Sequence, residues 1–135
     1  MINFKWIYIL LVCWAIIIFN GEIPGKIEGY YRPVISNFEI TQATGGPYST
    51  VFSGIFDKNR ACVFLDIEWY ITDSEYGDSK IQVSFEEGEM IRIPGKQVYG
   101  PWKVNIPLSR IEKDSYASVL HRCHSLWTTI TRVYP

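Results

Sequence analysis

A run of fourteen apolar residues, Trp6 to Phe19 (WIYILLVCWAIIIF), constrains the fold of this chain more than any other feature. A helix rises about 1.5 Å per residue, so a helix over residues 2–19 would reach roughly 27 Å, close to the thickness of a hydrocarbon core. Lys5 stands before the run, where its ammonium group can reach the lipid headgroups. We therefore predict that residues 1–20 form a single transmembrane anchor.

A cleaved signal peptide is the main alternative to an anchor. It would need small residues at the end of the apolar stretch, as in A-x-A, whereas residues 18–21 read IFNG. A lipoprotein signal would need a small residue before its cysteine, but Val12 precedes Cys13. A buried core helix is a third interpretation. The residues favour the uncleaved anchor over all of these.

The charges on either side of the run predict its orientation. Lys5 and the terminal amino group come before it, and no acidic residue precedes Glu22. Positively charged flanks remain on the cytoplasmic side of a membrane. We predict an inner-membrane protein with a cytoplasmic N-terminus and an extracytoplasmic domain.

Two further segments follow the anchor. Residues 20–33 (NGEIPGKIEGYYRP) carry glycines and prolines at a spacing that leaves no helical or strand period. We predict a Gly/Pro linker over residues 21–33 and one domain over residues 34–135, long enough to bury a core between two layers.

Residues 61–71 (ACVFLDIEWYI) carry the clearest strand pattern. Alternation predicts an apolar face of Ala61, Val63, Leu65, Ile67, Trp69 and Ile71, and an opposite face of Cys62, Phe64, Asp66, Glu68 and Tyr70. The same pattern predicts inward side chains for Ile81, Val83 and Phe85 and for Trp102, Val104, Ile106 and Leu108.

Weaker strand patterns occur around residues 35–41, 49–56, 118–124 and 127–133, with Gly, Pro and Asp turn signals between them. Residues 109–118 have room for one helical turn. About seven short strands without an amphipathic helix predict an all-β fold, an antiparallel two-sheet sandwich. An immunoglobulin-like arrangement is one form of this sandwich.

Charge and motifs exclude several functions. The net charge is −1 and no run of Lys or Arg is present, so we predict no nucleic-acid partner. The sequence has no Gly-x-Ser-x-Gly motif and no glycine-rich phosphate loop. Asp66 and Glu68 share a strand face, which is typical of a solvated surface. We predict neither enzymatic activity nor a cofactor.

Both histidines flank a cysteine in the sequence His121-Arg122-Cys123-His124. On a strand, the side chains of His121 and Cys123 point to one face and that of His124 to the other. One metal ion could therefore be coordinated by all three only at a strand end. A closed zinc site needs four ligands. The weak candidates for a metal or thiol-redox site are Cys62, His121, Cys123 and His124. Local hydrogen bonding of the histidines is the alternative.

The cysteines also allow a disulfide. If Cys13 lies in the membrane, Cys62 and Cys123 remain as a pair in an oxidising compartment, and we predict a bond between them. Because the pattern places Cys62 opposite Trp69, the bond would join neighbouring strands or strand ends instead of crossing the core. Free thiols and a metal site stay open as alternatives.

Three stretches, KNRACVFLDIEWY (58–70), GPWKVNIPL (100–108) and HRCHSLWTT (121–129), carry a resemblance to known proteins. Over residues 58–135 the chain resembles short uncharacterised membrane-anchored proteins of bacteria and tailed phages. This resemblance implies no activity and no residue roles.

The predicted function is a single-pass, membrane-anchored extracytoplasmic β-sandwich that acts as a binding module for a protein partner. A phage-encoded envelope or exclusion factor is one version of it. The alternative is a metal-binding or thiol-redox envelope protein built on Cys62, His121, Cys123 and His124.

Overall fold

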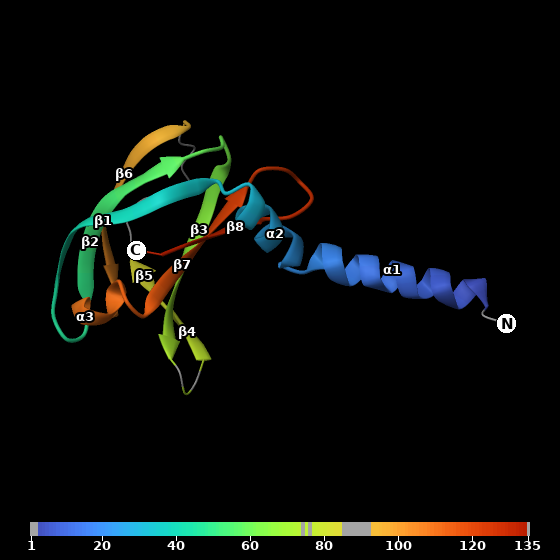
Figure 1. Cartoon of the computed structure of the whole chain (residues 1–135), viewed down its shortest axis with the longest axis horizontal. Helices are drawn as coiled ribbons and strands as arrows, with labels where there is room; N and C mark the ends of the chain where they lie inside the picture. Colours follow the sequence, from blue (N-terminus) through green and yellow to red (C-terminus); the bar gives the residue numbers. More distant parts are fainter. Residues whose placement is uncertain (1–2, 74, 76, 85–92, 135) are drawn as a thin grey trace.

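The computed structural model describes residues 3–73, 75, 77–84 and 93–134, and its domain consists of two antiparallel four-stranded sheets (Figure 1). The first sheet has the order β1-β2-β6-β5, formed by β1 (Ile35–Gly45), β2 (Thr50–Lys58), β6 (Gly95–Val104) and β5 (Val83–Ser84). The second has the order β4-β3-β7-β8, formed by β4 (Gly77–Ile81), β3 (Val63–Asp73), β7 (Ser115–Arg122) and β8 (Thr129–Val133). The prediction of an all-β fold with two antiparallel sheets is confirmed.

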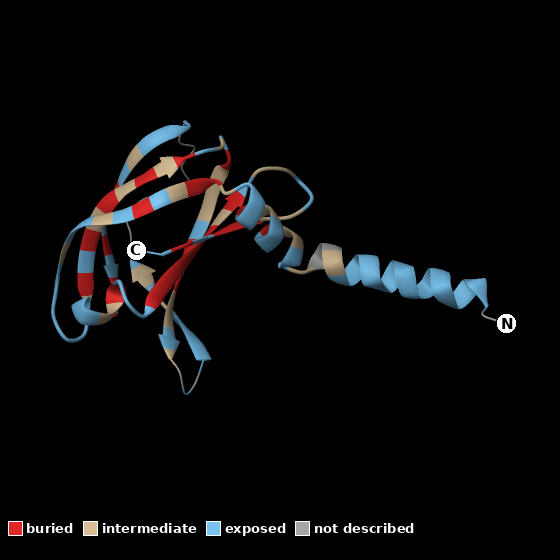
Figure 2. Ribbon diagram, in the orientation of Figure 1, coloured by how far each residue is buried: buried red, intermediate tan, exposed pale blue. Residues whose placement is uncertain are grey.

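Aromatic side chains fill the core between the sheets. Trp69 on β3 is completely buried, and its ring centroid lies 5.0 Å from that of Phe52 on β2. Tyr99 and Trp102 on β6 pack beside them, with ring centroids 4.5 Å apart. The buried positions recur at every second residue along β2, at Ile67 and Trp69 on β3, and at Trp102 and Val104 on β6 (Figure 2). The predicted inward face is therefore correct for the centre of β3 and for the end of β6.

The predicted alternation fails at the start of β3. Cys62 is only 4 % exposed and Phe64 packs against the core, although a strict alternation places both outward. The pairing of β3 with β7 shifts register between Phe64 and Asp66. Such a bulge inserts one extra residue and moves the preceding side chains to the other face. Ala61 is accordingly exposed.

The side chains of Leu108 and Phe85 were also predicted to point into the core. Leu108 is 39 % exposed because the chain leaves the sheet there and begins the short helix α3 (Leu108–Ile111). This helix is the single helical turn expected in this part of the chain. Phe85 lies outside the described residues.

Helix α1 (Phe4–Asn20) contains the apolar run and extends away from the domain (Figure 1). Its side chains are exposed along nearly the whole described length (Figure 2). Within the described part of the chain, no single helix has both the length and the apolar composition to cross a membrane. Residues 4–18 meet that test only together with helix α2 (Ile23–Tyr31), to which they are bent by 61°.

The expectation that residues 21–33 hold no helix is wrong, since α2 occupies most of that segment. Pro24 stands in the first turn of α2, where its missing N–H leaves no hydrogen bond unmade. Gly25 and Gly29 are buried against the edge strand β8. A Cβ atom on Gly25 would lie 1.9 Å from the Thr128 carbonyl oxygen, and one on Gly29 would lie 1.8 Å from that of Ile130. These glycines therefore let the helix backbone lie directly on the strand.

Candidate functional site

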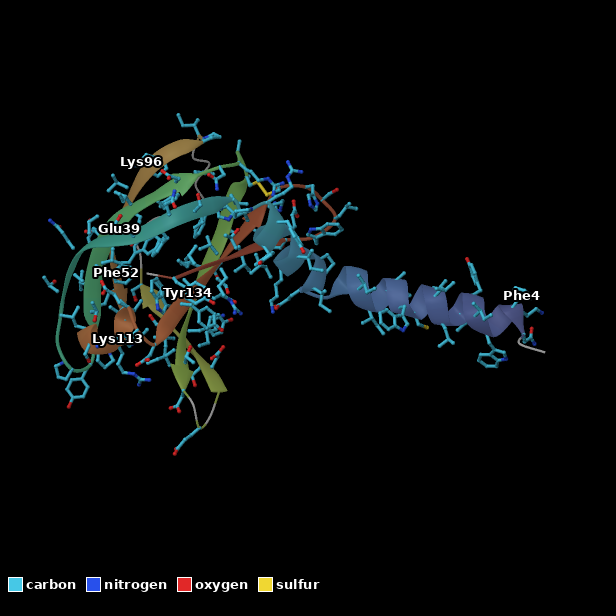
Figure 3. The ribbon with its side chains drawn as sticks, in the orientation of Figure 1. Phe4, Glu39, Phe52, Lys96, Lys113 and Tyr134 are labelled. Carbon is cyan, nitrogen blue, oxygen red and sulfur yellow. A yellow bond between two sulfur atoms is a disulfide. The ribbon has the colours of Figure 1, made fainter. Side chains whose placement is uncertain are left out.

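A disulfide joins Cys62 and Cys123, whose Cα atoms are 4.6 Å apart, as the sequence predicts. Cys62 stands just before β3 and Cys123 just after β7, and Val63 pairs with Arg122 across these neighbouring strands. The bond therefore closes the end of one sheet and does not cross the core. Figure 3 draws it in yellow at the end of the domain nearest to α2.

The two histidines have separate environments. His121 is 3 % exposed, and burial, reinforced by the positive charges of Lys58 and Arg60, lowers its pKa to about 4. Its ring is therefore neutral at pH 7, and its Nδ1 has no hydrogen-bond partner among the described residues. His124 is partly exposed, and its Nε2 lies 3.0 Å from a carboxylate oxygen of Glu28.

The four candidate ligands do not form a metal site in this arrangement. The thiols of Cys62 and Cys123 are consumed by their bond, and His124 is directed to Glu28. No group of three or more His, Cys, Asp or Glu side chains placed to hold a metal ion occurs in the described portion of the chain. His124 also accepts a local hydrogen bond at Nδ1 from the backbone N–H of Leu126 at 3.2 Å, whereas its contact with Glu28 spans 96 residues of sequence.

The carboxylate of Glu28 on α2 joins this helix to two loops of the domain. Its Oε1 accepts a hydrogen bond from Arg60 Nη2 at 2.9 Å, and its Oε2 accepts from Trp127 Nε1 at 2.7 Å. Thr129 Oγ1 also donates to Oε2 at 2.9 Å, beside the contact with His124. Burial by itself raises the pKa of Glu28, but hydrogen bonds from Trp127 and the other three partners bring it down to about 2. Glu28 is therefore ionised at neutral pH and fastens α2 to the sandwich.

Glu28 is not among the site residues predicted from the sequence, because it lies in the segment that was expected to be a linker. Its partners are 32 to 101 residues away along the chain, so no local pattern reveals the contact. One signal was available: Gly25 and Gly29 are four residues apart and lie on the same face of a helix.

An open groove of about 700 Å³ lies between α2, the start of β1 and β8. It is lined by Lys26, Gly29, Tyr30, Pro33, Ile35, Ser36, Asn37, Phe38, Ser118, Ile130, Thr131, Arg132, Val133 and Tyr134. Ile35, Phe38 and Val133 belong to the buried core and form an apolar floor, each at most 9 % exposed. Lys26 and Arg132 carry positive charge on the rim, and none of the described lining residues is acidic. The groove thus offers an apolar surface beside Arg132 and beside Lys26, whose ammonium pairs with Glu22 at 3.0 Å.

Two edge strands form the long walls of this groove. β1 and β8 each lie at the end of their sheet, so the sandwich is open between them. Near the groove β1 departs from regular pairing between Ser36 and Glu39, and Asn37 has a φ of 50°. This irregularity bends the strand away from a flat edge, which protects it from pairing with other chains.

Replacing Glu28 with glutamine should lower the free energy of unfolding by about 1 to 3 kcal/mol at pH 7, because hydrogen bonds to a buried charge are lost. The pKa of Glu28 falls from 4.5 in the unfolded chain to about 2 in the folded one, so the unfolded chain binds more protons between these values. The stability that Glu28 contributes is complete above pH 4.5 and is lost as the pH falls toward 2. Urea unfolding of the full-length protein and of Glu28→Gln in detergent at pH 7, 4.5 and 3 measures this contribution of Glu28 to the free energy of unfolding.

The stability difference between wild type and Glu28→Gln should accordingly shrink below pH 4.5. Glu22→Gln is the matched control, because the Glu22 side chain is 71 % exposed and pairs only with Lys26 among the residues described. That variant should change the free energy of unfolding by less than about 0.5 kcal/mol at every pH. Equal losses for the two variants would contradict the role given to Glu28.

No known protein family, curated protein or solved structure matches this chain, so its function is to be inferred from its own residues and their geometry.

Proposed function

We propose that this protein is a single-pass, membrane-anchored binding module. In this proposal α1 lies in the inner membrane, and the sandwich stands outside the cytoplasm and binds a segment of a partner protein. The groove between α2, β1 and β8 is the observation that carries the proposal. Its volume of about 700 Å³ and its apolar floor are typical of ligand sites, which are largely apolar with a few polar groups on the rim.

Exposure of the apolar side chains of α1 supports the membrane anchor. Trp6, Leu10 and Trp14 are each more than 60 % exposed, and α1 extends away from the two sheets (Figure 1). Apolar surface of this extent is covered by lipid or by another protein in a stable molecule. Lys5 on one side and Glu22 on the other support a cytoplasmic N-terminus.

The disulfide supports a location outside the cytoplasm. Structural disulfides persist in oxidising compartments and are rare in the cytosol. The Cys62–Cys123 bond closes a loop over a sequence separation of 61 residues and lies next to the loops that hold α2. It therefore stabilises the end of the domain that faces the anchor.

The strand order supports an immunoglobulin-like sandwich. With β1 to β8 taken in turn as strands A, B, C, C′, D, E, F and G, the sheets have the orders A-B-E-D and C′-C-F-G. Trp69 then stands on strand C, where immunoglobulin domains carry their buried tryptophan. The disulfide differs, because it joins the ends of strands C and F within one sheet. Since this fold serves many functions, the binding proposal depends on the groove and not on the fold.

The groove fits an extended peptide segment that contains an acidic group. The apolar floor of Ile35, Phe38 and Val133 would hold the apolar side chains of such a segment. Arg132 on the rim would pair with a carboxylate on such a segment, whereas Lys26 is paired with Glu22 at 3.0 Å. The short β8 and the irregular β1 restrict this binding to the length of the groove.

Site-specific photocrosslinking in the native membrane tests the proposal. A photoreactive benzoylphenylalanine at Tyr134, a groove residue that is 63 % exposed, should yield a discrete adduct with a partner protein. The same group at Tyr48, which is 84 % exposed and lies outside the groove lining, should yield none. Arg132→Glu should remove the adduct formed at position 134. The absence of any adduct at position 134, or the same adduct from both positions, would overturn the proposal.

A further inference from the structure

The outward face of α2 carries apolar and aromatic side chains that no described part of the domain covers. Ile23 and Ile27 are each 54 % exposed, Tyr30 is 80 % exposed and Tyr31 is 77 % exposed. At 3.6 residues per turn these four residues share one side of the helix, opposite the glycines that lie on β8. We call them the outward face of α2.

The connection to α1 places this face at the end of the apolar helix. Only Gly21 and Glu22 separate the two helices, so Ile23 lies at most about 11 Å from Asn20. With α1 across the bilayer, α2 therefore begins at the boundary between the hydrocarbon core and the headgroups.

The angle between the helices keeps α2 near that boundary. α2 has nine residues and is inclined by 61° to α1, so its length of about 13 Å advances only about 6 Å along the α1 axis. Each headgroup layer is about 5 to 8 Å thick. The whole of α2 thus fits within the headgroup layer when α1 stands close to the membrane normal.

The chemistry of the outward face suits a lipid surface of low net charge. Tyrosine favours the membrane interface, where its ring is apolar and its hydroxyl is hydrated. The exposed charges of Glu22 and Lys26 pair with one another at 3.0 Å. The loop between β7 and β8 lies beside α2 on the side from which α1 extends (Figure 1), and its Leu126 is 67 % exposed. An apolar face without excess charge matches zwitterionic phospholipid.

We propose that the outward face of α2 lies in the headgroup layer of the membrane and holds the sandwich at a fixed orientation to the bilayer. This inference rests on the proposed membrane anchor and deepens it. Because Glu28 and the two glycines fasten α2 to the domain, contact of α2 with lipid also orients the domain. Tyr30 belongs both to the outward face and to the groove lining, so the groove opens beside the membrane surface.

Spin labels on the full-length protein in phosphatidylcholine vesicles test this inference. Single cysteines replace Ile27, Ile9 or Tyr48 in a Cys13→Ser background with the Cys62–Cys123 disulfide intact. Power saturation compares the accessibility of each label to oxygen, which enters lipid, and to a water-soluble nickel complex. We expect the oxygen-to-nickel ratio at position 27 to be at least about twofold above that at position 48, and below that at position 9.

The two controls separate failure of this inference from failure of the anchor. A lipid-like ratio at position 9 with a ratio at position 27 equal to that at position 48 would overturn the inference and leave the anchor intact. A water-like ratio at position 9 would overturn the anchor and the inference together. A label at Tyr31 should reproduce the result at position 27, since both residues lie on the outward face of α2.

Discussion

Replacing Trp69 with alanine should lower the free energy of unfolding by about 3 to 5 kcal/mol, as for other large aromatic residues in protein cores. Trp69 is 0 % exposed, and it packs against Phe52 and Phe38 of the opposite sheet with ring centroids 5.0 and 6.3 Å away. The substitution would open a cavity between the two sheets, where neighbouring rings from both sides cannot collapse without moving their strands. Urea unfolding of the full-length protein in detergent at pH 7 gives the loss directly.

Tyr48→Ala is the matched control for Trp69→Ala. It removes an aromatic ring that is 84 % exposed, and it should change the free energy of unfolding by less than about 0.5 kcal/mol. Glu68 on β3 is less suitable, because its carboxylate accepts hydrogen bonds from Lys80 and Tyr70. A loss for Trp69→Ala no larger than that for Tyr48→Ala would show that Trp69 is not a core residue.

Replacing Cys62 and Cys123 together with alanine should destabilise the protein by about 4 kcal/mol. The disulfide closes a loop over a sequence separation of 61 residues, and its loss frees this loop in the unfolded chain. Reductant should lower the stability of the wild type by a similar amount and should leave the double variant unchanged. Unfolding in urea with and without reductant measures both effects.

Cys13→Ser is the control for the disulfide, because Cys13 is a free and exposed cysteine on α1. Its free energy of unfolding should stay within about 0.5 kcal/mol of the wild type, and reductant should still destabilise it. Mass spectrometry of non-reduced peptides from native membranes should find Cys62 linked to Cys123. If both cysteines react with an alkylating reagent without reductant, the disulfide and the extracytoplasmic location are both contradicted.

The alternation of apolar and polar residues was enough to predict the two-sheet architecture. Ile67 and Trp69 on β3, and Trp102 and Val104 on β6, are buried as the pattern predicts. A period of two is a local property of an extended chain, and burial of one face then decides which side each residue takes. The presence of two cysteines, Cys62 and Cys123, outside the apolar run likewise favoured a disulfide between them.

The alternation of apolar and polar residues did not predict which side chains are buried where the chain departs from regular strand geometry. The bulge between Phe64 and Asp66 brings Cys62 into the core, and no residue type at that position predicts a bulge. The alternation likewise continued through Leu108, where the chain begins a helix. Both deviations depend on how the neighbouring strands pair, which is a property of the assembled sheet.

Residue type and spacing along the chain were enough to predict the apolar run and the main strands of the sandwich, and they made the Cys62–Cys123 disulfide the favoured state over free thiols and a metal site. The docked helix at residues 23–31 and the groove beside it follow instead from contacts made in the folded molecule. Glycine and proline disfavour an isolated helix, but at Gly25 and Gly29 their small size lets the backbone contact β8, and Glu28 gains four partners there. Such contacts join residues up to 101 positions apart, so they exist only once the sheets have brought those residues together.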